Sequence, residues 1–130
     1  IDVYKSSVNF LIVYVMEAHG SDEWPLGLQR SSTRQHKTID ERLTAATGYR
    51  AQVTDSLRTN VTWAIDTMHN EFYSSFGGWP EVHLIISATG TLLLRTESNL
   101  GEGTVKGGEW DVLVEEYLVQ SLKVETRGFV

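Results

Sequence analysis

Four titratable residues lie beside the ends of expected strands or before an expected helix, in positions where side chains can move protons. Glu17 and His19 follow the apolar run 10–15, and His36 lies just before the next expected helix. Asp66 follows a second apolar run, on the side of an open α/β sheet where ligands usually bind. An imidazole changes protonation near neutral pH, so it can pass or hold a proton. We therefore predict that Glu17, His19, His36 and Asp66 are the catalytic residues.

Each of these residues also has a simpler structural interpretation. Loop histidines often make only ordinary hydrogen bonds, and Asp22 is best explained as a loop-closing acceptor. Thr67 is best explained as the cap of the next helix. Carboxylates and imidazoles do suit zinc or iron, so Glu17, His19, Asp22 and His36 are conceivable metal ligands. They show no short ligand spacing, however, and we predict neither a metal nor a cofactor.

Composition excludes several classes of function. The 130 residues include no cysteine, which removes thiolate catalysis and disulfides from this stretch of chain. The net charge of −6 opposes a phosphate-backbone partner, so nucleic acid is not expected. The longest apolar run, residues 10–16, is far shorter than the ~20 residues that a membrane span needs. Length and an apolar content of 41% predict one domain over residues 1–130.

The elements that would position these side chains alternate along the chain. Runs of β-branched and apolar residues predict buried strands at 10–15, 61–65 and 82–86, with a hairpin turn at 88–90 leading to a strand at 91–95. Helices are expected after a Thr38 cap with a stop at Gly48, at 70–76, and at 110–122. The first helix has an apolar stripe of Ile39, Leu43 and Ala46. This order predicts an α/β fold with a parallel pair and a mixed sheet.

Three stretches resemble iodothyronine deiodinases. They are NFLIVYVMEAH at 9–19 with Ser21-Asp22 and Trp24, QHKTIDERL at 35–43, and IDTMHN at 65–70 followed by Pro80-Glu81 and a strand. The strand that ends in Glu-Ala-His-x-Ser-Asp-x-Trp is the most specific of the three. The resemblance implies a thioredoxin-like mixed sheet flanked by helices, and reductive removal of halogen from an iodinated phenol.

In that family a selenocysteine or cysteine nucleophile sits after the first core strand. The matching position falls upstream of Ile1, so we expect residues 1–130 to lack the first core strand and its helix. The resemblance places His19 and His36 beside the reacting centre. It also places Pro80 where thioredoxin folds often have a cis proline. Val82 stands where the family has an arginine, which weakens the expectation that thyroid hormone is the substrate.

Three functions stay open from the sequence. The first is a deiodinase-like oxidoreductase that acts on a small phenolic or thiol substrate. The second is a non-catalytic binding or assembly subunit, either a homodimer or a domain whose sheet a partner chain completes. Trp24, Trp79 and Phe129 would be its interface anchors. The third is acid–base chemistry without a thiol by His19, His36 and Asp66.

Overall fold

The structure is a computed structural model, and it describes residues 4–25, 33–77 and 82–95. The chain divides into two compact units, residues 1–80 and 81–130. The first unit contains β1 (Leu11–Tyr14), α1 (Ile39–Gln52), α2 (Asp55–Thr59), β2 (Thr62–Ile65) and α3 (Glu71–Phe76). The second contains β3 (Leu84–Ile86) and β4 (Leu92–Arg95). Helices and both kinds of strand pairing confirm the predicted α/β class, which is consistent with a thioredoxin-like domain.

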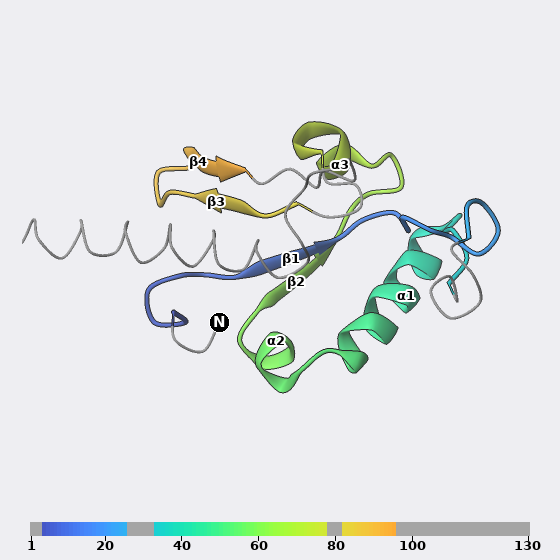
Figure 1. Cartoon of the computed structure of the whole chain (residues 1–130), viewed down its shortest axis with the longest axis horizontal. Coiled ribbons are helices and arrows are strands. Elements are labelled where there is room, and N and C mark those ends of the chain that lie inside the picture. Colours follow the sequence, from blue (N-terminus) through green and yellow to red (C-terminus); the bar gives the residue numbers. More distant parts are fainter. Residues whose placement is uncertain (1–3, 26–32, 78–81, 96–130) are drawn as a thin grey trace, which may run out of the picture. The chain divides into compact units, whose positions relative to one another are not determined.

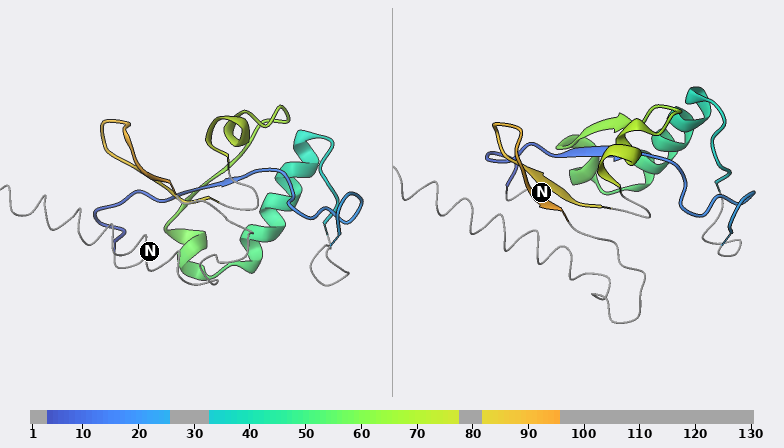
Figure 2. Two further views of the ribbon diagram at one scale, coloured as in Figure 1. Left: turned by 45° about the horizontal axis from the view of Figure 1, so that its top comes forward. Right: turned by 90° about the horizontal axis from the view of Figure 1, so that it is seen from above.

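In the first unit, β1 and β2 form the parallel pair that their apolar sequences predict (Figure 1). Leu11 pairs with Thr62 and Tyr14 pairs with Ile65. The Asp66 N–H continues the ladder by donating to the Tyr14 carbonyl at 2.8 Å. Parallel strands need a crossover connection, and here α1 and α2 lie within it (Figures 1 and 2). The ends of β1 and β2 are thereby held side by side.

Helix α1 begins where the sequence predicts, because Thr38 caps it. The Thr38 backbone is extended, and its hydroxyl accepts a hydrogen bond from the Glu41 N–H at 3.2 Å. The Glu41 carboxylate in turn accepts from the Lys37 N–H at 2.7 Å. Two donors at the helix start are thus satisfied by side chains of the same short segment. This cap fixes where residues 35–37 enter the helix.

The end of α1 differs from the predicted one. The helix does not stop at Gly48 but continues to Gln52. Glycine ends a helix when it adopts a left-handed conformation, and Gly48 does not have a positive φ. The next residue, Tyr49, lies 6.1 Å from the Tyr14 and Trp63 rings, centroid to centroid. These contacts with β1 and β2 favour another turn of helix; α2, which follows, was not predicted.

The buried face of α1 also differs from the predicted apolar stripe. Ile39 and Leu43 are 45% and 52% exposed, whereas Ala46 is 6% exposed. Arg42, one turn before Ala46, is only 2% exposed. Positions 42 and 46 lie on the same face of a helix. The face that α1 buries therefore includes an arginine, which periodicity of apolar residues cannot reveal.

Replacing Gly48 with alanine is expected to raise the free energy of unfolding by about 0.5–1 kcal/mol. Gly48 lies in the helix interior, and an added Cβ would meet no heavy atom within 4 Å apart from the neighbouring helix backbone. Alanine loses less backbone entropy than glycine on folding into a helix. Urea unfolding monitored by circular dichroism measures the change. Gly90→Ala is the matched control, and it should destabilise because Gly90 has φ +86.

The second unit contains the predicted hairpin. Strands β3 and β4 are antiparallel, with Leu84 opposite Arg95 and an irregularity between Ile85 and Ile86. The turn is closed by a hydrogen bond from the Gly90 N–H to the Ser87 carbonyl at 2.9 Å. Strand β3 is shorter than the predicted 82–86. The expected helix at 110–122 and Trp79, Pro80 and Phe129 lie outside the described residues, and the single domain over 1–130 stays a prediction.

Candidate functional site

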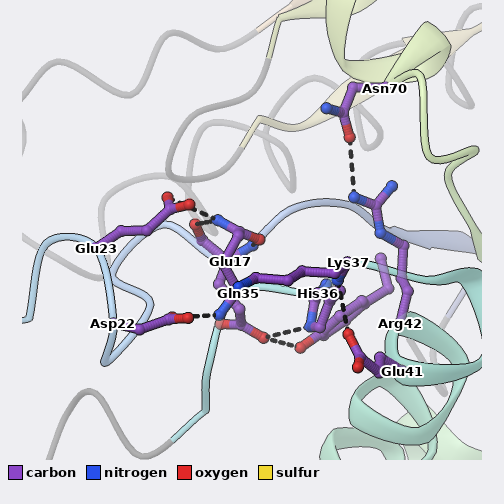
Figure 3. Close-up of polar contacts among 10 residues, drawn as sticks. Glu17, Asp22, Glu23, Gln35, His36, Lys37, Glu41, Arg42 and Asn70 are labelled. Atoms are coloured by element: carbon purple, nitrogen blue, oxygen red, sulfur yellow. Dashed lines mark hydrogen bonds and ion pairs between the residues drawn. The ribbon is translucent and has the colours of Figure 1, made fainter.

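The segment after β1 and the segment before α1 are joined by the Gln35 side chain (Figure 3). Its amide oxygen accepts from the Glu17 N–H at 3.1 Å, and its amide nitrogen donates to the Glu17 carbonyl at 3.0 Å. The Ser21 N–H donates to the Thr33 carbonyl at 2.9 Å. A Cβ at Gly20 would lie 3.1 Å from the Gln35 backbone nitrogen, so the two segments pack closely at this glycine. Together these contacts hold the backbone of Glu17 in place.

Asp22 has the loop-closing role that the simpler interpretation gave it. Its carboxylate accepts from the Gln35 N–H at 2.8 Å and pairs with Arg34 at 3.3 Å. The Gln35 N–H, with a smaller contribution from Arg34, holds the pKa of the Asp22 carboxyl below its ordinary value. Asp22 therefore fixes the backbone next to His36 rather than orienting His19.

Glu17, His36 and Tyr14 meet at one carboxylate oxygen. Tyr14, the last residue of β1, donates its hydroxyl proton to Glu17 Oε1. The same oxygen lies 3.5 Å from His36 Nε2. The His36 and Tyr14 rings lie 5.7 Å apart, centroid to centroid. The structure therefore brings together two of the four predicted residues and adds a tyrosine that the sequence did not single out as functional.

Burial sets the protonation of this cluster. His36 is 6% exposed, and neither of its ring nitrogens has a hydrogen-bond partner among the described residues. Burial lowers the pKa of His36, Glu17 opposes that shift, and Arg42 adds to it. Burial and the hydrogen bond to Glu17 raise the pKa of Tyr14. Near neutral pH, His36 is therefore neutral and Tyr14 keeps its proton, so a neutral imidazole and a phenol hydroxyl face the same Glu17 oxygen.

The stability of the protein is expected to fall as the pH drops below about 6.5, the ordinary pKa of histidine. Because the pKa of folded His36 is lowered, the unfolded chain takes up a proton first. The contribution of His36 is thus complete above about pH 6.5 and is lost as the pH falls through the folded-state pKa. Urea unfolding at about pH 7.5 and about pH 5.5 measures the difference.

His36→Gln should reduce this loss of stability, whereas His69→Gln removes an exposed imidazole and is the matched control. Equal pH dependence in the wild-type chain and in His36→Gln would contradict the assignment to His36.

His19 lies in a separate tight turn. The N–H groups of Glu23 and Trp24 donate to the Gly20 carbonyl at 3.1 and 3.2 Å. His19 Nδ1 is 3.3 Å from the Trp24 carbonyl, and the two rings meet edge to face at 5.7 Å. The indole of Trp24 is 64% exposed. The structure therefore pairs His19 with Trp24, while Glu17 is paired with His36.

Asp66 is occupied by backbone donors. Its carboxylate accepts from the N–H groups of Thr67, Phe72 and Tyr73 at 2.8, 2.9 and 3.0 Å. Asp66 is 3% exposed. Thr67, the expected cap, makes only a 3.5 Å contact with the Glu71 N–H. The start of α3 is therefore stabilised mainly by Asp66, whose oxygens are committed to holding the chain.

Sequence reasoning missed Arg42 altogether. Its guanidinium reaches from α1 to the turn after β2, where it donates to the carbonyls of Asp66 and Thr67. It also donates to Asn70 (Figure 3). The available signal in the sequence was a charged residue four positions before Ala46, which the predicted apolar stripe includes. It is weak, because most arginines on a helix are exposed.

A hollow of about 660 Å³ lies at the N-terminal end of α1 and is open to solvent. Its walls include residues of the preceding segment and the first turns of the helix: Gln35, His36, Lys37, Asp40, Glu41 and Thr44. His36 is thus shared by the buried cluster and by a space large enough for a small molecule.

The described residues contain neither a cluster of metal ligands nor a membrane-spanning helix. No group of three or more histidine, aspartate and glutamate side chains in 4–25, 33–77 and 82–95 is placed to hold a metal ion. In the same part of the chain, no helix is long and apolar enough to span a membrane.

Comparison with known proteins gives consistent matches. The family model described as iodothyronine deiodinase matches residues 1–99. The chain is 33% identical to thyroxine 5-deiodinase of Ovis aries over 92 residues, which is 71% of this chain and 30% of that protein. For the Homo sapiens protein the values are 31%, 71% and 28%. Type I iodothyronine deiodinase of Xenopus laevis is 30% identical over 95 residues, 73% of this chain and 35% of that protein. The chain therefore spans about a third of the length of these relatives.

Proposed function

We propose that this chain, which belongs to the iodothyronine deiodinase family, forms the proton-transfer part of a reductive dehalogenation site in a thioredoxin-like oxidoreductase. The observation that supports this most strongly is the convergence of Tyr14 and His36 on Glu17. In this proposal the nucleophile is a selenocysteine or cysteine in a segment upstream of Ile1. The substrate class is a halogenated phenol.

Reductive dehalogenation requires that one proton be delivered to the ring carbon that loses the halogen. The anionic selenium or sulfur attacks the halogen and forms a bond to it, and the electrons of the carbon–halogen bond return to the ring carbon. That carbon then takes a proton, and the phenol leaves without its halogen. A small-molecule thiol then displaces halide from the selenium or sulfur and forms a mixed selenenyl sulfide or disulfide; a second thiol releases the reduced nucleophile, and the two thiols leave as a disulfide. Proton delivery in the first step is the part for which this chain has suitable groups.

Tyr14, Glu17 and His36 are suited to that delivery because their protonation states are complementary. A neutral imidazole donates through one nitrogen and accepts through the other. Glu17 accepts the hydrogen bond of the Tyr14 hydroxyl, and its carboxylate lies 3.5 Å from His36 Nε2. In the proposed relay this contact shortens to a hydrogen bond, so that a proton lost from His36 is replaced through Glu17. The Gln35 hydrogen bonds keep Glu17 in place. This is the arrangement of a short proton relay.

The hollow at the start of α1 is the proposed position of the phenol. His36 is one of its lining residues, but both ring nitrogens are buried, so the proposal requires the imidazole to become accessible when the phenol binds. Lys37 and Asp40 give its rim both signs of charge. Such a rim suits a polar substituent on the ring without selecting a strongly anionic ligand.

A non-catalytic binding or assembly subunit is the alternative. It is favoured by exposed apolar side chains on strands, since Leu11 is 58% exposed on β1 and Leu92 is 47% exposed on β4. The cysteine-free composition agrees with either reading, because the proposed nucleophile is upstream.

The deciding experiment is an iodide-release assay on the full-length chain that includes the upstream segment. An iodinated phenol is the substrate and dithiothreitol is the reductant. We expect release that stops when the upstream selenocysteine or cysteine is replaced by serine. Absence of any upstream cysteine or selenocysteine, together with no release from iodinated or brominated phenols, would overturn the proposal. A mass above the monomer in that case would favour the alternative.

A further inference from the structure

We propose that Arg42 is a positioning residue of this site: its buried guanidinium holds α1 against the turn after β2 and places a fixed positive charge near His36. The role in catalysis rests on the proposed function, but the electrostatic role can be tested without turnover.

The contacts of Arg42 define where the charge is held. Nη1 donates to the carbonyl of Asp66 at 3.2 Å and to that of Thr67 at 2.5 Å. Nη2 donates to Asn70 Oδ1 at 2.9 Å. These bonds join the first turn of α1 to the segment that links β2 and α3. The planar guanidinium suits this task because its donors point in fixed directions.

The partners of Arg42 are neutral oxygens, which leaves its charge effective over a distance. In the described part of the chain no carboxylate forms an ion pair with it, and its Nε has no hydrogen-bond partner there. Arg42 is 2% exposed, so little water screens it. A buried charge acts on its neighbours more strongly than a surface charge does.

His36 is surrounded by groups of both signs. The Tyr14 ring lies 5.7 Å from it, and Glu17 approaches it to 3.5 Å. Arg42 donates to the Asp66 carbonyl, and the Asp66 N–H donates to the Tyr14 carbonyl, so the guanidinium is held beside the strand that carries Tyr14. Glu41 and Arg42 on α1 add one charge of each sign. Burial is the main cause of the lowered His36 pKa; the two carboxylates oppose it, and Arg42 adds to it. A histidine next to glutamate normally becomes a cation more easily. Here Arg42 counteracts that tendency and helps to keep His36 neutral, which is the form that can both donate and accept a proton.

Substitutions at position 42 separate charge from hydrogen bonding. Arg42→Lys keeps the charge and loses the three-point contact, whereas Arg42→Gln loses the charge and keeps an amide donor. Asn70→Ala removes one partner of Arg42 and leaves the charge in place. The readout is the pKa of the His36 imidazole from an NMR titration, assigned by the signal that disappears in His36→Gln.

The expected result is a rise in the His36 pKa of roughly half a unit or more in Arg42→Gln, with values near wild type in Arg42→Lys and Asn70→Ala. In the active full-length chain, the acidic limb of the pH–rate profile should move to higher pH in Arg42→Gln only.

An unchanged His36 pKa in Arg42→Gln, or an equal shift in Arg42→Lys, would overturn the proposal. Should Arg42→Gln not fold, Arg42→Met provides the neutral variant, and Arg42→Lys alone still tests retention of the pKa. Because the titration needs no turnover, loss of the dehalogenation hypothesis would leave this result intact.

Discussion

Replacing Asp66 with alanine is expected to lower the free energy of unfolding by about 3 kcal/mol. The change removes the acceptor for three backbone N–H groups, on Thr67, Phe72 and Tyr73. Asp66 is 3% exposed, so water cannot easily replace the lost acceptor. Buried donors without partners account for the size of the effect. Urea unfolding with a fixed m-value measures it.

Two further substitutions make this prediction specific. Asp66→Asn keeps one oxygen and should lose only part of the stability. Thr67→Ala removes the residue that the sequence favoured as the cap, and its only described contact with a helix N–H is 3.5 Å long; the expected loss is under about 0.5 kcal/mol. Equal losses in Asp66→Ala and Thr67→Ala would show that Asp66 does not stabilise the start of α3.

Replacing Glu17 with glutamine is expected to lower kcat/KM for dehalogenation about 100- to 1000-fold in the full-length chain. Glutamine keeps the size of the side chain, but its neutral amide cannot take and return a proton between Tyr14 and His36. The Gln35 bonds to the backbone of residue 17 are unaffected, so the segment should keep its conformation. Initial rates of iodide release provide the measurement.

Tyr14→Phe removes the hydroxyl that bonds Glu17 and should cause a similar loss if the three residues act as a unit. Glu23→Gln is the matched control, because Glu23 is exposed and meets Gln35 only at 3.4 Å. Less than a threefold effect of Glu17→Gln, with normal folding by circular dichroism, would remove Glu17 from the mechanism.

The candidate site was predictable in part. Placing Glu17 and His36 among the functional residues followed from their positions and from the family resemblance, and the structure brings them to 3.5 Å. Their catalytic role, like that of His19 and Asp66, stays a prediction. Tyr14 was hidden inside an apolar run, where an aromatic side chain is normally a packing residue. Only the fold shows that its hydroxyl faces Glu17.

Local chemistry and residue pattern were enough for much of the fold. The apolar runs indicated parallel strands, the Thr38 cap placed the start of α1, and the Ala-Thr-Gly segment indicated the hairpin. These features depend on neighbours within a few residues, and the structure confirms them. The end of α1 was wrong because Tyr49 packs against Tyr14 and Trp63, residues far away in sequence.

The sequence by itself therefore determined the fold class, the family and the two segments that hold the candidate residues. Tertiary structure alone decided what those residues do for one another. In the folded chain, Asp66 accepts hydrogen bonds from the backbone of α3. Glu17 contacts both Tyr14 and His36. Arg42 occupies a buried position where an apolar residue would be expected. The physical reason is that hydrogen bonding and burial depend on which distant segments meet, and a one-dimensional pattern of residue types does not contain that information.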